Sequence, residues 1–310
     1  MTEVTGFRTL KAMKQKSFTP RGVIPPVITP LTDNEQVNNP ALRKLLDFLV
    51  SEGIHGVFPV GTTGEFYALT EFEYQSILET TVDQIRGRVP VYAGVNHITT
   101  RGAINLVRIA QASHVDALSV LTPMFISPSQ DDLYEHYVRI AAETDLPIIL
   151  YNNKPKTGVD IKPETAARLA NIENIIGIKD STGDLTNTEE YIRLTQGQDF
   201  HVLMGRDTLI YASLCYGAAG AIAACANIAP RLCADIYNHF IAGDHEQARA
   251  LQYKIAPLRI AFTIGTFPAV IKAGLSLLGL DAGPCYAPIR SLEKDEIEKL
   301  RTIMHSSGLI

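Results

Sequence analysis

The chain has 310 residues, of which 46% are hydrophobic and 20% are charged, a composition that supports a large core and excludes a disordered chain. Its net charge of -5 argues against a nucleic-acid or membrane-surface binder, because both need a basic face, so we expect a small-molecule partner. No stretch reaches the ~20 apolar residues of a membrane span and no apolar signal sequence is visible, so we expect a cytoplasmic protein.

Short apolar runs alternate with amphipathic stretches along the chain, a pattern typical of parallel strands joined by helices. Residues 1–20 precede this pattern and are expected to form a polar N-terminal arm. The predicted strands are residues 22–29, 56–60, 89–95, 117–121, 147–151, 175–179, 201–204 and 220–223. Eight strand–helix units without a linker favour one closed (β/α)8 TIM barrel over residues 21–228, with an open doubly wound sheet as the alternative.

Helix signals lie between the predicted strands. Thr70 and Glu73 have the spacing of a capping box before a helix over residues 74–85. Pro163 stands near the first turn of another helix, which runs through Leu169.

The chain beyond the eighth predicted strand is too long for the last barrel unit alone. Its helical spacing recurs in residues 232–241, 248–260, 268–278 and 297–304. Asp244 followed by Gln247 predicts an N-cap between the first two of these helices. We predict a C-terminal helical extension, residues 229–310, that packs on the barrel and offers part of an oligomer interface.

The four cysteines show no C-x-x-C spacing and lie in apolar stretches. They are Cys215, Cys225, Cys233 and Cys285. We expect them to be small buried hydrophobic side chains, with neither a disulfide nor a zinc site. No cluster of His, Asp and Cys follows the predicted strands, so we expect no metal and no cofactor.

Lys179 ends an apolar run, residues 175–178, where a buried strand would not normally hold a charge. Burying an unpaired ammonium costs several kcal/mol, and burial lowers its pKa toward neutrality. A neutral amine is a nucleophile that forms Schiff bases with carbonyl substrates. The alternative is a lysine at a strand end that extends to solvent or pairs with Asp180.

Two more groups follow predicted strands, at the end of a barrel where the chemistry lies. Residues 61–65, Gly-Thr-Thr-Gly-Glu, present the hydroxyls of Thr62 and Thr63 beside the backbone of Gly64, an arrangement that suits a carboxylate. Tyr151 follows a buried run, and its phenol at the barrel mouth is able to transfer protons. The alternatives are an ordinary turn and a tyrosine that only packs.

These residues carry a family resemblance. The turn 61–65, the segment 151–158 and residues 177–180, in that order and spacing, resemble the dihydrodipicolinate synthase and N-acetylneuraminate lyase family. The resemblance extends from about residue 22 to residue 288. It implies a pyruvate-dependent class I aldolase on a TIM barrel, usually a homotetramer built as a dimer of dimers.

The resemblance also implies roles. Lys179 would form the Schiff base with pyruvate, and Thr63 with the neighbouring amides, including that of Gly64, would bind the pyruvate carboxylate. Thr62 would relay protons, and Tyr151 would be the general acid and base. These roles fit the chemistry, because an imine at C2 of pyruvate lets C3 lose a proton and attack an aldehyde as an enamine.

Two positions differ from the synthase members of the family. Phe125 stands where they have a tyrosine that crosses a dimer interface, and it has no hydroxyl. Lys156 stands where they have an arginine that binds the carboxylate of the aldehyde substrate. A lysine keeps the charge but loses the bidentate fork, and a solvated loop lysine is the alternative.

Other positions resemble the lyase branch. Residues 280–285 and the loop that begins at Ser181 are similar to neuraminate lyases, and Gly205 and Asp207 match positions that hold substrate hydroxyls there. Thr208 and Ala224 replace an acidic residue and a serine of those lyases, which argues against sialic acid as the substrate.

We therefore predict a Schiff-base lyase that makes or breaks carbon–carbon or carbon–oxygen bonds in a 2-oxo acid. The favoured activity is a pyruvate-dependent aldolase or dehydratase of hydroxylated 2-oxo (sugar) acids, with an aldehyde or sugar acid as the second partner. One alternative is 4-hydroxy-tetrahydrodipicolinate synthase, which condenses pyruvate with aspartate semialdehyde. Another is a catalytically silent sensor of 2-oxo acids.

Overall fold

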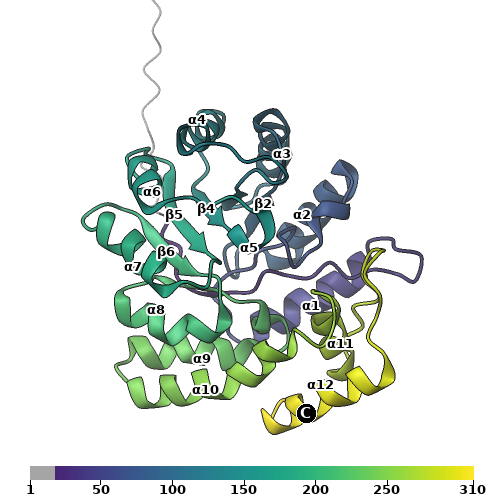
Figure 1. Cartoon of the computed structure of the whole chain (residues 1–310). Helices are drawn as coiled ribbons and strands as arrows, with labels where there is room; N and C mark the ends of the chain where they lie inside the picture. The colour runs from purple at the N-terminus through teal and green to yellow at the C-terminus, as the bar shows by residue number, and fades with distance from the viewer. Residues whose placement is uncertain (1–17) are drawn as a thin grey trace, which may run out of the picture.

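A computed structural model describes residues 18–310, and a parallel sheet forms its centre (Figure 1). Its strands are β1 (Gly22–Ile24), β2 (Tyr92–Val95), β3 (Ala117–Leu121), β4 (Ile148–Asn152), β5 (Ile175–Asp180), β6 (His201–Met204) and β7 (Gly220–Ile222). They are hydrogen-bonded in the order β1-β7-β6-β5-β4-β3-β2. The sheet is therefore curled, with β1 and β2 at its two edges.

The predicted second strand, residues 56–60, lies between these edges. Phe58 bridges to Pro26, just after β1, and Val57 bridges to Val91, just before β2, both in parallel. The two bridges close the barrel, so the predicted TIM barrel is confirmed. The prediction of regular strands over residues 56–60 and 25–29 is wrong. Prolines remove the N–H donors that longer ladders would need, at positions 25, 26, 59 and 90.

The barrel interior contains one apolar side chain from each strand and one from the closing segment. These residues are Ile24, Phe58, Tyr92, Ala117, Ile149, Ile176, Leu203 and Ile222, all buried. A larger apolar cluster fills the space between the strands and the surrounding helices. Filled interior layers are typical of TIM barrels and leave the carboxyl ends of the strands for a site.

Helices follow the strands around the barrel. They are α1 (Asn39–Ser51), α2 (Glu71–Ile85), α3 (Thr100–Ala112), α4 (Gln130–Ala141), α5 (Lys154–Thr157), α6 (Pro163–Leu169), α7 (Leu185–Leu194) and α8 (Ile210–Tyr216), with short 3-10 helices η1 (Phe66–Ala68), η2 (Asp207–Leu209) and η3 (Ala224–Asn227). The predicted capping box is confirmed, because the Thr70 hydroxyl accepts the N–H of Glu73 and the Glu73 carboxylate accepts the N–H of Thr70.

The predicted C-terminal helices are confirmed as α9 (Pro230–Ile241), α10 (His245–Ala261), α11 (Ala269–Leu277) and α12 (Lys294–Ser306). Asp244 caps α10 by accepting the N–H of Gln247 at 3.1 Å, as predicted. Helix α9 packs on β1 and α11 packs on η3, so this part of the chain covers one side of the barrel (Figure 1).

Three cysteines are buried as expected, but Cys215 is exposed, and its predicted burial is wrong. The buried face of α8 is formed by Ile210, Ser213 and Leu214, so Cys215 falls on the outer face of that helix. The predicted N-terminal arm lies almost entirely outside the described residues. Within residues 18–310 no helix has the length and hydrophobicity needed to span a membrane.

Candidate active site

Lys179 is directed into the barrel by an irregularity in β5. The register between β4 and β5 shifts by one residue, so that Ile149 pairs with Gly177 and Tyr151 pairs with Lys179. Side chains alternate along a strand, and Ile149 lies in the barrel interior. The same alternation places the side chains of Tyr151 and Lys179 inside the barrel, at its carboxyl end.

The Lys179 ammonium has no acidic partner within the described residues. The side chain is 4% exposed, so it does not extend to solvent. The carboxylate of Asp180 instead accepts hydrogen bonds from Thr182 and Thr188, at 2.8 and 2.7 Å. Burial lowers the pKa of Lys179, although the neighbouring Tyr151 opposes the shift. These contacts favour a nucleophilic amine over an ion pair with Asp180.

Tyr151 lies beside this amine. The Lys179 Nζ is 3.9 Å from the centroid of the Tyr151 ring and 5.0 Å from that of Phe58. The Tyr151 hydroxyl lies 3.2 Å from the Thr62 Oγ1 and accepts a hydrogen bond from the Asn153 Nδ2 at 2.9 Å. Burial raises the pKa of Tyr151, but the Lys179 charge and these hydrogen bonds outweigh burial, so the pKa is lowered overall.

The turn that follows residues 56–60 is fixed against the first segment of the barrel. The Thr29 hydroxyl donates to the Gly64 carbonyl at 2.7 Å, and a Cβ on Gly64 would stand 2.9 Å from the Val27 carbonyl oxygen. Only a glycine allows this approach. Thr63 is buried and Thr62 is half-buried in the same turn. The structure therefore brings Thr62, Tyr151 and Lys179 together from three separate segments at the carboxyl end of the barrel.

The last residue of the turn, Glu65, is anchored by the C-terminal part of the chain. Its Oε1 lies 2.7 Å from the Lys272 Nζ in α11, and its Oε2 accepts the N–H of Tyr286 at 2.9 Å. Glu65 and Lys272 are both buried. We did not anticipate this pair or Asn153. The only sequence signals were a lysine within an apolar helix and a second amide after Tyr151.

Three residues predicted to bind substrate, Ser181, Gly205 and Asp207, lie in the segments after β5 and β6. Ser181 is buried, and a Cβ on Gly205 would collide with its hydroxyl, so the loops after β5 and β6 are in close contact. Asp207 is buried, where Oδ1 accepts the N–H of Cys225 at 2.7 Å and Oδ2 lies 3.1 Å from the Arg259 Nε. Its carboxylate is thus engaged within the protein.

Lys156 and Phe125 are both exposed at the surface. Lys156 is exposed on α5, directly after β4. Phe125 is 93% exposed in the loop between β3 and α4, with a positive φ of 72°. Position 125 therefore offers no hydroxyl group to the site. Among residues 18–310, no three His, Cys, Asp or Glu side chains are grouped to hold a metal ion.

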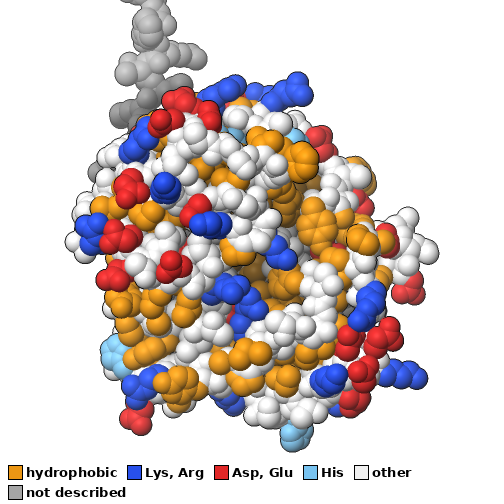
Figure 2. All heavy atoms as spheres, in the orientation of Figure 1, with side chains coloured by type: hydrophobic (Ala, Val, Ile, Leu, Met, Phe, Trp, Pro, Cys, Tyr) orange, Lys and Arg blue, Asp and Glu red, His pale blue; other side chains and the backbone are white. Residues whose placement is uncertain are grey.

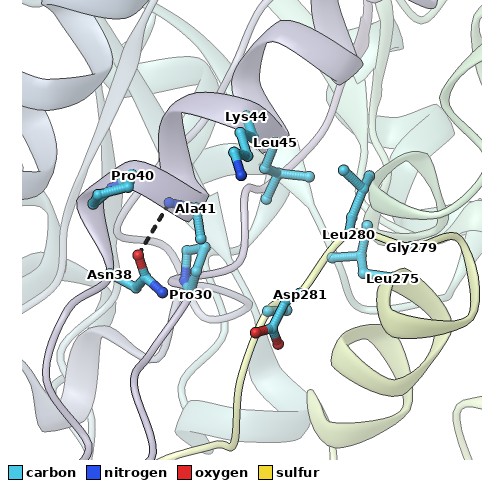
Figure 3. A pocket seen from close by; sticks show the side chains of 11 residues that line it. Pro30, Asn38, Pro40, Ala41, Lys44, Leu45, Leu275, Gly279, Leu280 and Asp281 are labelled. Atoms are coloured by element: carbon cyan, nitrogen blue, oxygen red, sulfur yellow. Dashed lines mark hydrogen bonds between the residues drawn. The ribbon is translucent and has the colours of Figure 1, made fainter.

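A separate cavity of about 310 Å³ lies between the start of α1 and the end of α11 (Figure 3). Asn38 caps α1 there by accepting the N–H of Ala41 at 3.1 Å, and Lys44 and Asp281 add one charge of each sign. None of the residues of the Lys179 site lines this cavity, so we assign it no part in the chemistry.

Comparison with known proteins agrees with this geometry. The model of the dihydrodipicolinate synthetase family matches residues 19–307. A 4-hydroxy-tetrahydrodipicolinate synthase from Methanothrix thermoacetophila is 38% identical over 284 residues, which are 92% of this chain and 96% of that protein.

Solved structures give the same result. Chloride-inhibited dihydrodipicolinate synthase from Acinetobacter baumannii, complexed with pyruvate, has a TM-score of 0.90 at 34% identity, covering 94% of this chain and 99% of its own. A prophage protein of this family from E. coli K12, also complexed with pyruvate, has a TM-score of 0.91 at 30% identity, with the same coverage of 94% and 99%.

The fold and the relatives define a class I aldolase or lyase, so the prediction of an enzyme is confirmed and the silent sensor is disfavoured. The chain belongs to the dihydrodipicolinate synthetase family.

Proposed function

We propose that this enzyme condenses pyruvate with aspartate semialdehyde, the reaction of 4-hydroxy-tetrahydrodipicolinate synthase. Relatives of that name that match nearly the whole chain support this reaction over the sugar-acid activity that we favoured from sequence. The observation that carries the proposal is the buried Lys179, which has no acidic partner within the described residues and lies against Tyr151.

The first step is imine formation. The neutral amine of Lys179 attacks C2 of pyruvate, and the carbonyl oxygen leaves as water. Thr63 and the backbone amides of its turn, including that of Gly64, hold the carboxylate of pyruvate during this step. Burial favours the step because it lowers the pKa of Lys179 and so raises the fraction of neutral amine.

The second step makes the carbon–carbon bond. Tyr151 takes a proton from C3 of the imine, and the resulting enamine attacks the aldehyde carbon of the second substrate. Tyr151 then returns the proton to the aldehyde oxygen. Thr62, whose Oγ1 lies 3.2 Å from the Tyr151 hydroxyl, relays protons between Tyr151 and water.

A second candidate acts on a hydroxylated 2-oxo acid through the same imine, either by carbon–carbon cleavage, which is the reverse of an aldol condensation, or by loss of water. Two observations favour it: the missing hydroxyl at Phe125, and the contact of Ser181 with Gly205. In either reaction we propose that Asp207 positions its loop, since Arg259 and Cys225 already engage its carboxylate. A cytoplasmic homotetramer remains our expectation from the sequence.

Parallel kinetic assays test the choice between these reactions. We expect the enzyme to consume pyruvate with aspartate semialdehyde at saturable rates, and to release pyruvate from 2-oxo-3-deoxy sugar acids at least about a hundredfold less efficiently in kcat/KM. Efficient cleavage of a sugar acid, with no reaction of aspartate semialdehyde, would replace the synthase by the second candidate. Lys179→Ala is the background control for both assays.

A further inference from the structure

Arg206 lies next to the strand that holds the nucleophile. Leu203 of β6 pairs with Lys179 of β5, and Arg206 follows three residues later, at most about 10 Å further along the chain. Its guanidinium leans over the loop after β5, because a Cβ on Gly183 would stand only 3.0 Å from the Arg206 Nε. The side chain is thus held at the carboxyl end of the barrel.

The positive charge of Arg206 is not neutralised by the described residues. The half-buried guanidinium forms neither a hydrogen bond nor an ion pair within residues 18–310. The adjacent carboxylate, Asp207, is paired with Arg259 at 3.1 Å. Burial, followed by repulsion from Arg259, lowers the pKa of Arg206. Arg206 and Arg259 thus place two positive charges near the one carboxylate of Asp207, and an anion would balance the remaining charge.

The other side of β5 also has a cation. Lys156 follows β4, and no acidic residue of the described chain pairs with it, whereas Lys154 in the same helix lies 3.1 Å from the Asp160 carboxylate. Figure 2 shows Lys and Arg side chains around the hollow at the centre of this face. Lys156 is exposed and Arg206 is half-buried, so an anion held by Arg206 is better shielded from water.

We propose that Arg206 binds the distal carboxylate of the second substrate and thereby selects acidic aldehydes over neutral ones. The proposal rests on the proposed condensation. It assigns the binding of the distal carboxylate to Arg206 in the loop after β6, because Lys156 has no bidentate fork for a carboxylate. In the open-chain product, pyruvate and aspartate semialdehyde contribute seven carbons. One terminal carboxylate lies next to the imine carbon and the other lies at the far end.

Two seven-carbon 2-oxo acids test the assignment without requiring turnover. 2-Oxoheptanedioate has the distal carboxylate, and 2-oxoheptanoate has a methyl group in its place. Borohydride trapping on Lys179, followed by mass spectrometry, gives the concentration of each acid that produces half-maximal adduct. We expect the native enzyme to prefer the dicarboxylate by about tenfold to a hundredfold, the range for a charged hydrogen bond.

Arg206→Gln should abolish this preference while leaving the trapping of pyruvate unchanged, and Arg206→Lys should restore only part of it. Lys156→Gln is the matched control and should keep most of the preference. The assignment is overturned if Arg206→Gln keeps the preference, or if Lys156→Gln alone removes it. If the preference for the dicarboxylate does not depend on Arg206 but the native enzyme still traps pyruvate, only the assignment of Arg206 fails and the condensation stands. A native enzyme that traps no pyruvate would refute the condensation and the assignment together.

Discussion

The carboxylate of Glu65 and the ammonium of Lys272 form a buried ion pair, with 2.7 Å between Oε1 and Nζ. Lys272 also donates to the Pro284 carbonyl at 2.5 Å, and Glu65 also accepts the N–H of Tyr286. Glu65 has a positive φ of 56°, which is costly for a residue other than glycine. Residues 272–286 therefore hold the turn that contains Thr62 and Thr63 in its observed shape.

Lys272→Met should destabilise the protein and weaken substrate binding. The change leaves Glu65 buried without its partner, which typically costs about 3–5 kcal/mol of unfolding free energy. Urea denaturation measures this loss, and the KM for pyruvate should rise more than kcat falls. Lys299→Met removes an exposed pair with Asp295 and should change stability by less than about 1 kcal/mol. Equal effects of the two substitutions would contradict the anchoring role.

Tyr151→Phe should lower kcat by about 10² to 10⁴, the usual contribution of a general acid–base, with little change in stability. Borohydride should still trap pyruvate on Lys179 in this variant, because the amine remains. Tyr137→Phe is the matched control. That buried hydroxyl donates to the Val120 carbonyl at 3.3 Å, away from the site, and its loss should leave kcat unchanged. A Tyr151→Phe enzyme with the native rate would remove Tyr151 from the mechanism.

The lowered pKa of Lys179 makes a prediction about stability and pH. Because the unfolded lysine titrates near 10.5 and the folded one below it, the unfolded state binds more protons between these values. Native stability should therefore rise with pH through this window, relative to Lys179→Met. Denaturation of both proteins at several pH values up to about 9 measures the difference. If the stability of the native enzyme minus that of Lys179→Met stays constant or falls as pH rises, the ammonium of Lys179 is not destabilised by burial.

Much of the barrel was predictable because strand and helix periodicity are local properties. The alternation around Tyr151 and Lys179 indicated where strands end, and the Thr70 capping box marked the start of α2. The sequence did not show that prolines would reduce residues 56–60 to two bridges, because a missing donor matters only in the assembled sheet. The exposure of Cys215 likewise depends on which face of α8 meets the core.

Tertiary contacts explain what was missed in the candidate site. The register shift beside Gly177 turns Lys179 inward, and it depends on the neighbouring strand. The Glu65–Lys272 pair joins segments far apart in the chain, so no local sequence pattern predicts it. Arg206 belongs to no sequence motif. Its charge is unbalanced because the adjacent Asp207 pairs with Arg259, a contact that the sequence does not predict.

The most direct test of the central claim is intact-protein mass spectrometry after borohydride reduction with pyruvate, followed by peptide mapping. The proposed mechanism predicts one reduced pyruvate adduct per chain, located on Lys179 and absent from a folded Lys179→Ala variant. No adduct, or an adduct on another lysine, would contradict the imine mechanism and leave Lys179 without the assigned role.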